Sequence, residues 1–164
     1  MKKIRIGING CGRIGRMFLR MAHFTDDIQV VVINELMEAK TLAHLLQYDS
    51  VHRKFSANVI CEKNNLLVDG KKITLIKHEK IPDIKWNNFD VDVVIECSGK
   101  YRYRKELQSH IDVGAKKVIL SSPPLDDSIK TIVLGVNDEI LNNEDLIISN
   151  ASCTTNSAAP LIKI

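Results

Sequence analysis

A single cysteine, Cys153, stands in a short polar run at residues 149–156, Ser-Asn-Ala-Ser-Cys-Thr-Thr-Asn. An apolar stretch at residues 146–148 precedes this run, and a segment with helical character follows it. At a junction between a strand and a helix, free backbone N–H groups and the helix dipole stabilise a thiolate, which is the nucleophilic form of cysteine. By residue type alone, a cysteine is more often a packing residue. Cys153 is therefore a candidate nucleophile whose assignment depends on the rest of the chain.

A glycine-rich turn follows the first apolar segment of the chain. Residues 3–8 are typical of a buried strand, and Gly10, Gly12 and Gly15 come directly after it in a Gly-x-Gly-x-x-Gly pattern. In such a pattern the first glycine permits a tight turn, the second lets the backbone approach a pyrophosphate, and the third lets the next helix pack closely. A helix over residues 13–22 would point its positive end at the phosphates.

A carboxylate after the next apolar segment supports the same interpretation. Residues 29–33 are expected to form a second strand, and Glu35 lies twenty residues beyond Gly15. A carboxylate at this spacing accepts a hydrogen bond from the adenosine ribose of NAD and repels the 2′-phosphate of NADP. The alternative is an ordinary turn between strand and helix with a surface glutamate. The combination of strand, turn, helix and carboxylate favours a dinucleotide site.

The remaining elements alternate between strand and helix, which is typical of a mainly parallel sheet covered on both faces. Residues 66–75 interrupt this alternation, because they have the pattern of an antiparallel hairpin with its turn at Asp69 and Gly70. We therefore predict an α/β fold, a Rossmann-type doubly wound, mainly parallel sheet with an antiparallel hairpin insertion. The other expected helices cover residues 40–47 and 105–113, and the other expected strands cover residues 91–97, 118–121, 132–136 and 146–149.

Composition places the chain among ordinary globular proteins. Its 164 residues suffice for one hydrophobic core, and its 45% hydrophobic and 26% charged residues include no apolar run long enough for a membrane span. The four cysteines are widely spaced, so the sequence predicts neither a metal site nor a disulfide framework. The amino-terminal residues enter a strand without a signal-peptide pattern. These features favour a cytoplasmic protein without a membrane partner.

The charge pattern argues against a nucleic-acid partner. The net charge of +3 is small, although residues 100–105, Lys-Tyr-Arg-Tyr-Arg-Lys, alternate bases with aromatics as some nucleic-acid surfaces do. This segment follows an expected buried strand and opens an expected helix. We interpret it as the solvated edge of a cofactor pocket, because true nucleic-acid binders usually show an extended basic face.

Several runs of this chain resemble glyceraldehyde-3-phosphate dehydrogenases, and the cysteine run is the most specific of them. The resemblance covers the whole chain in order, but only about the first half of the family's usual length. A stretch at residues 33–36 and another at residues 43–46 also look like the erythrose-4-phosphate dehydrogenase branch, which acts on a different substrate. The matching runs lie at residues 8–16, 48–50, 114–118, 135–137 and 149–156.

The resemblance implies oxidation of a phosphorylated aldehyde with NAD as cofactor. The Cys153 thiolate would attack the aldehyde carbon, and loss of a hydride from the thiohemiacetal would give a thioester that inorganic phosphate or water releases. Ser152 and Thr154, on either side of the nucleophile, would contribute to the substrate-phosphate site. Residues 1–150 would form the NAD-binding domain. Residues 151–164 would begin the catalytic domain, whose remainder would be absent.

The same resemblance assigns further residues to the cofactor. Arg13 and Ile14 would meet the pyrophosphate through their backbone, and Asn9 and Asn34 would flank the adenosine together with Glu35. The other positions that it assigns are Lys80, Ser98, Gly99, Tyr101 and Ser121. For Lys80 and Tyr101 a plain surface role is an equal alternative, because exposed lysine and tyrosine rarely need a function.

Some positions depart from the family pattern. Glu35 stands where Asp is usual, which keeps the charge, and Ser157 replaces a second Cys found in many members. Cys11 replaces a usual Phe between two cofactor glycines, so we expect it to be oxidation-sensitive. We expect Cys97, in a central strand, to be the slowest thiol to react.

The general base of the family's reaction is a histidine from its second domain. The histidines of this chain all precede Cys153, stand in no catalytic motif, and are expected to be exposed or partly buried: His23, His44, His52, His78 and His110. We therefore expect the cofactor half of an enzyme, inactive alone, whose complete relatives are homotetramers. A free-standing, non-catalytic NAD-binding module is an alternative. A semialdehyde dehydrogenase is another, although the Ala-Ser-Cys-Thr-Thr-Asn run argues against it.

Overall fold

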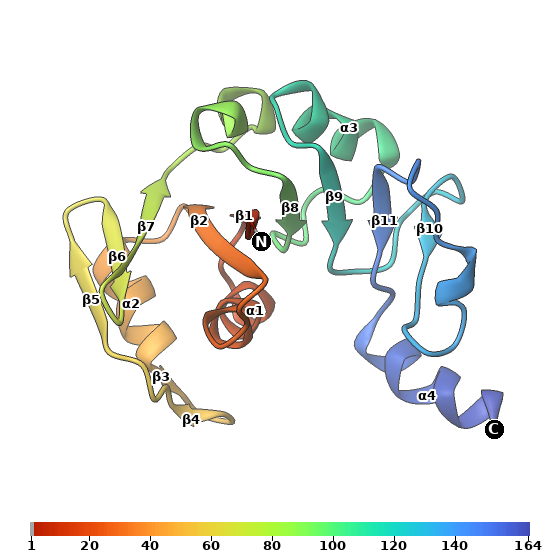
Figure 1. Ribbon diagram of the computed structural model, residues 1–164, viewed down its shortest axis with the longest axis horizontal. Coiled ribbons are helices and arrows are strands. Elements are labelled where there is room, and N and C mark those ends of the chain that lie inside the picture. Colours follow the sequence, from red (N-terminus) through yellow and green to blue (C-terminus); the bar gives the residue numbers. More distant parts are fainter. Residues whose placement is uncertain (1) are drawn as a thin grey trace.

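The computed structural model describes residues 2–164, and its centre is a sheet of nine strands (Figure 1). The strand order is β10-β11-β9-β8-β1-β2-β7-β6-β5, and β3 pairs with β4 in a separate ribbon. The strands are β1 (Ile4–Asn9), β2 (Ile28–Asn34), β3 (Tyr48–Asp49), β4 (Arg53–Lys54), β5 (Val59–Glu62), β6 (Asn65–Val68), β7 (Lys71–Ile76), β8 (Val93–Glu96), β9 (Lys117–Leu120), β10 (Lys130–Thr131) and β11 (Ile147–Ser149).

Every pairing from β10 across to β7 is parallel, and only the β7–β6 and β6–β5 pairings in this sheet are antiparallel. The chain first builds outward from β1 through β2 to β7, and then returns to add β8, β9 and β11 on the other side of β1. The direction of winding therefore reverses between β1 and β8. Ligands of doubly wound sheets bind at such a reversal, beyond the carboxyl ends of the strands. The predicted fold class is confirmed.

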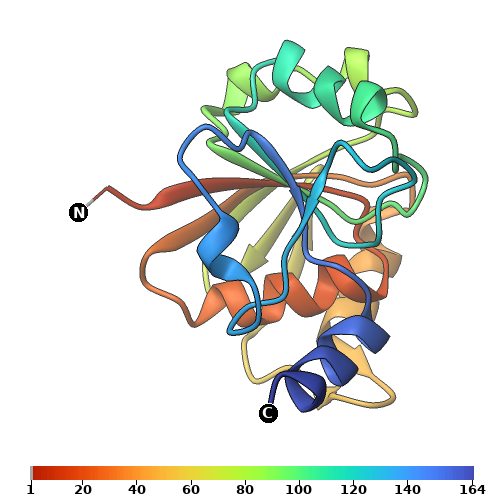
Figure 2. The same cartoon turned by 90° about the vertical axis from the view of Figure 1, so that its right-hand side faces the viewer.

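Helices cover both faces of the sheet (Figures 1 and 2). Two helices, α1 (Arg13–His23) and α2 (Ala39–Gln47), lie against one face, and α3 (Arg104–Asp112) lies against the other, together with the 3-10 helices Ile81–Asp83 and Trp86–Phe89. Because both faces are covered, consecutive residues of the central strands are buried, at Ile6–Asn9 in β1, Val30–Asn34 in β2 and Val94–Glu96 in β8. The two cores contain, respectively, Ile8, Leu19, Ile33, Leu42, Leu46 and Leu66, and Trp86, Val94, Leu107, Val118, Leu120 and Ile147.

The predicted hairpin is present as β6 and β7. Asp69 and Gly70 form its turn with φ values of 48° and 76°, and positive φ at both central residues is the geometry that Asp-Gly favours in tight hairpins. β7 then pairs in parallel with β2, with Val32 opposite Thr74. The hairpin is therefore attached to the edge of the parallel sheet, and β5 extends it by one strand that the sequence did not indicate.

The prediction of a strand at residues 132–136 is wrong, because the strand in this part of the chain is Lys130–Thr131 and ends before them. The ladder with β11 ends after Ile132, whose N–H still donates to Ser149 O. The N–H of Val133 instead donates to Asn137 Oδ1 over 2.7 Å, and Gly135 takes a φ of 78°. The chain turns there despite its apolar residues, and only β10 (Lys130–Thr131) is strand.

The predicted helix after the cysteine run is present as α4 (Cys153–Lys163), at the carboxyl-terminal end of the chain (Figure 1). All of its residues are at least partly exposed. Lys163 Nζ donates to the carbonyl oxygens of Gly135 and Val136, both over 2.9 Å, which fixes the end of α4 to the turn after β10. Across residues 2–164, no helix combines the length and the apolar character needed to cross a membrane.

Candidate cofactor site and nucleophile

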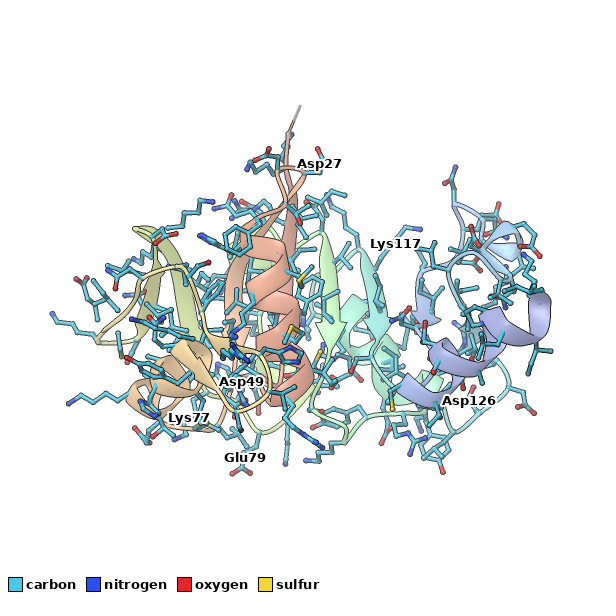
Figure 3. All side chains as sticks on the ribbon, turned by 90° about the horizontal axis from the view of Figure 1, so that it is seen from below. Asp27, Asp49, Lys77, Glu79, Lys117 and Asp126 are labelled. Carbon is cyan, nitrogen blue, oxygen red and sulfur yellow. The ribbon has the colours of Figure 1, made fainter. Side chains whose placement is uncertain are left out.

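A cleft of about 390 Å³ opens beyond the carboxyl ends of β1, β2 and β8, at the reversal of the winding. Figure 3 shows the two ends of the sheet: Asp27 and Lys117 lie at the amino ends of β2 and β9, and Glu79 lies at the opposite edge, beyond the carboxyl end of β7. The lining of the cleft comes from four separate segments of the chain, at residues 9–12, 34–37, 78–84 and 97–101. Those predicted to bind the cofactor that line this cleft are Asn9, Gly10, Gly12, Asn34, Glu35, Ser98 and Tyr101.

The three glycines of the turn differ in what surrounds them. Gly10 has a φ of 82°, and a Cβ added there would lie 2.5 Å from the Cα of Ser98. A Cβ on Gly15 would lie 2.5 Å from the carbonyl oxygen of Gly10. A Cβ on Gly12, by contrast, would have no atom of the described chain within 4 Å apart from its two chain neighbours. Gly10 and Gly15 are therefore needed for packing, whereas Gly12 leaves open space beside the cleft.

The amino end of α1 faces the same open space. In the part of the chain that the structure describes, no side chain caps this helix end, and its first turn carries no acidic residue. Its first residues, Arg13 and Ile14, are exposed. The N–H groups of the first turn are therefore free to bind an anion, with the helix dipole in support.

Glu35 joins two loops at the rim of the cleft. Its Oε2 accepts a hydrogen bond from the N–H of Cys11 over 2.6 Å, and its Oε1 accepts one from the N–H of Met37 over 3.0 Å. A carboxylate oxygen can accept two hydrogen bonds, so each oxygen keeps a site for a hydroxyl donor. The arrangement suits a ribose between the glycine turn and the loop that leads to α2.

The remaining predicted cofactor residues occupy the walls or lie beyond them. Tyr101 donates its hydroxyl hydrogen to Glu79 O over 2.9 Å, which holds its ring at the side of the cleft. Lys80 lies outside the cleft lining, in an adjoining hollow that shares Tyr101 with it. Gly99 and Ser121 are also outside the lining, and the N–H of Ser121 donates to Glu96 O over 3.0 Å at the end of β9.

The thiols near the glycine turn differ from expectation. Cys11 is 0% exposed, so it is not the accessible, oxidation-sensitive thiol that its position suggested. Burial, with a contribution from the negative charge of Glu35, raises the pKa of Cys11 far above its ordinary value. Cys97 lines the cleft and is only partly buried, and burial raises the pKa of its thiol to about 11. Cys11, not Cys97, is the least accessible of the four free cysteines.

Cys153 is exposed and begins α4. Ser152 caps this helix, because its Oγ accepts the N–H of Thr155 over 3.0 Å, and it also lies 2.8 Å from Thr154 Oγ1. The two residues predicted to hold the substrate phosphate are therefore in contact with each other. Asn156 fixes the helix start, with its Nδ2 donating to Asn150 O over 2.7 Å and to Ser152 O over 3.0 Å.

The nucleophile and the cleft share one edge of the sheet. Asn9 of β1 is paired with Glu96 of β8, which is paired with Leu120 of β9, which is paired with Ser149 of β11. Neighbouring strands are about 4.8 Å apart, so about 15 Å separates the end of β1 from the end of β11. Cys153 follows Ser149 by four residues. The fold therefore places the Cys153 run beyond the same edge of the sheet as the cleft, three strand spacings along that edge.

The buried pair of Glu96 and His110 has no counterpart in the predicted site. Both side chains are 0% exposed, and His110 Nε2 lies 3.0 Å from Glu96 Oε2. The expectation that every histidine is exposed or partly buried is wrong for His110. A single acidic residue inside the apolar run of β8 was the signal that could have pointed to Glu96, because a buried carboxylate needs partners.

The fold, the open glycine turn and the rim carboxylate define a dinucleotide-binding α/β domain of the doubly wound class. The chain belongs to the family described as the NAD binding domain of glyceraldehyde 3-phosphate dehydrogenase, whose model matches residues 4–104. NAD is the cofactor of this domain family, as the sequence predicted.

Curated relatives extend the similarity over almost the whole chain. The chain is 47% identical to the glyceraldehyde-3-phosphate dehydrogenase of Thermotoga maritima over 162 residues and 47% identical to that of Geobacillus stearothermophilus over 163. It is 44% identical to glyceraldehyde-3-phosphate dehydrogenase 2 of Bacillus subtilis over 163 residues. These matches cover 98–99% of this chain and 48% of each relative. The chain thus spans about half the length of the curated relatives it matches.

Proposed function

We propose that this chain provides the NAD-binding half of a phosphorylating glyceraldehyde-3-phosphate dehydrogenase. The observation that carries the proposal is the open space beside Gly12, below the uncapped end of α1 and next to the carboxylate of Glu35. A pyrophosphate fits the first two features, and the adjoining ribose fits the third. Residues 1–150 form the cofactor domain in this proposal, and residues 151–164 begin the catalytic one.

Each part of the cofactor has residues suited to it. The backbone of Gly12, Arg13 and Ile14 binds the pyrophosphate through free N–H groups. Glu35 accepts from the ribose, and Tyr101 forms a side wall. The positions outside the cleft lining belong to its surroundings in this proposal, with Ser121 on the side of the nicotinamide and Lys80 near the adenine.

Cys153 is the nucleophile of the proposed reaction. Its thiolate attacks the aldehyde carbon of the substrate, and the carbonyl oxygen takes up a proton to give a thiohemiacetal. NAD, when bound, would supply the hydride acceptor, and the thiohemiacetal would become a thioester by losing its hydride to NAD and its hydroxyl proton to the general base. Inorganic phosphate then attacks the thioester carbon, and the thiolate leaves. Ser152 and Thr154 hold a phosphate group beside the thiol through their hydroxyls.

The substrate and assembly also belong to this proposal. The relatives described above are named for glyceraldehyde 3-phosphate, which favours that aldehyde over erythrose 4-phosphate. In this proposal the general base is a histidine of the family's second domain, as the resemblance implies. His110 and His23 are unsuited to that role, because His110 is buried against Glu96 and His23 is paired with Asp69 over 2.9 Å. The whole enzyme is a homotetramer, as in the family that the sequence resembles.

Calorimetric titration of the full chain with NAD tests the cofactor site. Gly12→Ala is the decisive variant, because Gly12 has extended backbone with a φ of −68° and a ψ of −152°, and the added methyl has no atom within 4 Å beyond its chain neighbours in the described structure. Its thermal unfolding should match that of the wild type, while NAD affinity falls by about tenfold or more, since the methyl occupies the path of the pyrophosphate. Equal NAD affinity of the two proteins, or no binding to the wild type, would contradict the proposed function.

A further inference from the structure

A chain of buried polar side chains leads from the cleft to the core on the side of α3. Asn9 Nδ2 donates to Glu96 Oε2 over 2.6 Å, and His110 Nε2 lies 3.0 Å from the same oxygen. Trp86 Nε1 donates to His110 Nδ1 over 2.9 Å. Asn9 is 3% exposed and the other three side chains are 0% exposed. This network of hydrogen-bonded side chains connects β1 and β8 with α3 and the 3-10 helix Trp86–Phe89.

At its other end the same chain continues along the lining of the cleft. Asn34 Nδ2 donates to Asn9 Oδ1 over 2.8 Å and to His78 O over 2.9 Å, while Asn34 Oδ1 accepts the N–H of His78 over 2.8 Å. Glu96 Oε1 accepts the N–H of Ser98 over 2.7 Å. Asn9, Asn34, His78 and Ser98 all line the cleft, whereas Glu96 does not.

The partners fix the direction of every hydrogen bond in this chain. An indole N–H can only donate, so His110 Nδ1 must accept and the ring proton must reside on Nε2. The neutral His110 therefore donates to Glu96. As a carboxylate, Glu96 can only accept, and it does so from His110, Asn9 and Ser98. Asn9 must then direct its NH₂ group to Glu96 and its carbonyl to Asn34.

We propose, resting on the NAD-binding function above, that Glu96 is a positioning residue of the cofactor site. It acts through Asn9, Asn34 and Ser98, whose polar groups it orients, and it touches no cofactor itself. His110 and Trp86 keep the carboxylate in place from the core side. The three strands that meet at the cleft are joined at their carboxyl ends by this network, so the floor of the cleft is ordered before NAD binds.

The isosteric change Glu96→Gln would replace a hydrogen-bond acceptor by a donor without changing the shape of the side chain. The directions of the hydrogen bonds described above would then no longer match. If the glutamine oxygen accepts from Ser98, its NH₂ group faces the donors of both Asn9 and His110. Relief requires the Asn9 amide to flip, and Asn34 must then flip or lose its bond. A flipped Asn34 would face the N–H of His78 with its own NH₂ group. The mismatch of donors and acceptors that begins at residue 96 therefore extends to Asn34 in the lining of the cleft. This is what we expect of a residue that positions the cofactor site.

The test combines NAD titration with ¹⁵N NMR on the full chain. Glu96→Gln should weaken NAD binding about tenfold, since several hydrogen-bond partners become mismatched. The side-chain NH₂ resonances of Asn9 and Asn34 should shift in the free protein. The matched control is Asp92→Asn, at the amino end of β8, where Asp92 accepts from the N–H of Arg5 and from Lys116 Nζ. This control should leave NAD affinity and both amide resonances unchanged.

Failure of the wild-type protein to bind NAD would contradict the proposed function. Two other results, which do not depend on NAD binding, would overturn the role proposed for Glu96. One is a Glu96→Gln protein whose Asn9 and Asn34 amide resonances match the wild type. The other is a wild-type His110 whose ring ¹⁵N spectrum shows the proton on Nδ1. The second measurement also decides the matter if Glu96→Gln does not fold. Trp86 is the only tryptophan, so its single indole N–H resonance identifies the network in either protein.

Discussion

Glu35 shows how one side chain prepares a site before the ligand arrives. Its carboxylate accepts N–H groups from both the glycine turn and the loop after β2, at Cys11 and Met37. A glutamine could accept from only one of them and would direct its NH₂ group at the other. The charge is therefore needed both for the shape of the rim and for the choice between NAD and NADP.

Glu35→Gln should weaken NAD binding by about 1.5–3 kcal/mol, the range for a hydrogen bond to a charged group. NADP binding should weaken less, because the charge that repels its 2′-phosphate is gone. Calorimetry with both nucleotides measures the two affinities. Glu38→Gln is the matched control, since Glu38 is exposed and its one ion-pair partner among residues 2–164 is Lys77, on the neighbouring surface. Loss of NAD affinity in the control to the same degree would count against the assignment of Glu35.

The four thiols should react in the order of their accessibility. Cys153 is exposed, Cys61 and Cys97 are partly buried, and Cys11 is fully buried with a raised pKa. Because the thiolate is the reactive form, Cys153 should be alkylated first and Cys11 last at neutral pH. Iodoacetamide labelling followed by peptide mass spectrometry gives the order. Labelling of Cys11 before Cys97 would show that the glycine turn opens in solution.

The Cys97 thiol should also make the free energy of unfolding decrease at alkaline pH. Its pKa is about 11 in the folded chain, above the ordinary value of 9.0. Between these values the unfolded chain releases the proton while the folded chain keeps it, so stability is complete below pH 9 and falls as pH rises toward 11. Urea titrations at pH 8, 9 and 10 should show a smaller loss for Cys97→Ser than for the wild type. Equal losses would mean that Cys97 does not contribute.

At the scale of elements, the turn between β1 and α1 separates the needs of folding from those of binding. Gly10→Ala should lower the free energy of unfolding by about 1–3 kcal/mol or more, because a methyl at positive φ would meet the backbone of Ser98. Gly12→Ala should leave that free energy nearly unchanged. Thermal or urea unfolding of the two variants provides the comparison. Equal destabilisation by both would show that the turn has a different backbone in solution.

Local patterns predicted the elements whose signals are local. The hairpin depended on Asp69 and Gly70, which favour positive φ, and the glycine turn depended on spacing alone. The end of β10 could not be predicted, because it depends on the side chain of Asn137 accepting the N–H of Val133. Likewise, Glu96 and His110 are fourteen residues apart and meet only when α3 packs on β8. Sequence periodicity carries no information on such pairs.

At the scale of the molecule, the candidate binding and reactive residues lie at one edge of the sheet. The cleft, the Glu96 network and the Cys153 run all lie beyond carboxyl ends of parallel strands. The winding reverses between β1 and β8, so the loops leaving these strands diverge and open the cleft between them. At the amino ends of the strands, the ion pair of Asp92 with Lys116, 2.6 Å apart, joins neighbouring segments and lines no part of the cleft. A ligand should therefore affect the two edges unequally.

Hydrogen exchange with and without NAD measures this inequality along the whole chain. Saturating NAD should slow exchange at the N–H groups of the first turn of α1, which have no internal acceptor, and at those of Met37 and Ser98, which are held by side chains of the site. The amides at the opposite edge, near Asp27 and Lys117, should exchange as in the free chain (Figure 3). These amides serve as the internal control, because global stabilisation by a ligand would slow only those that exchange through complete unfolding. Protection concentrated around Asp27 and Lys117 would place the nucleotide at the amino ends of the strands. That result would contradict both the assigned cleft and the role given to Gly12.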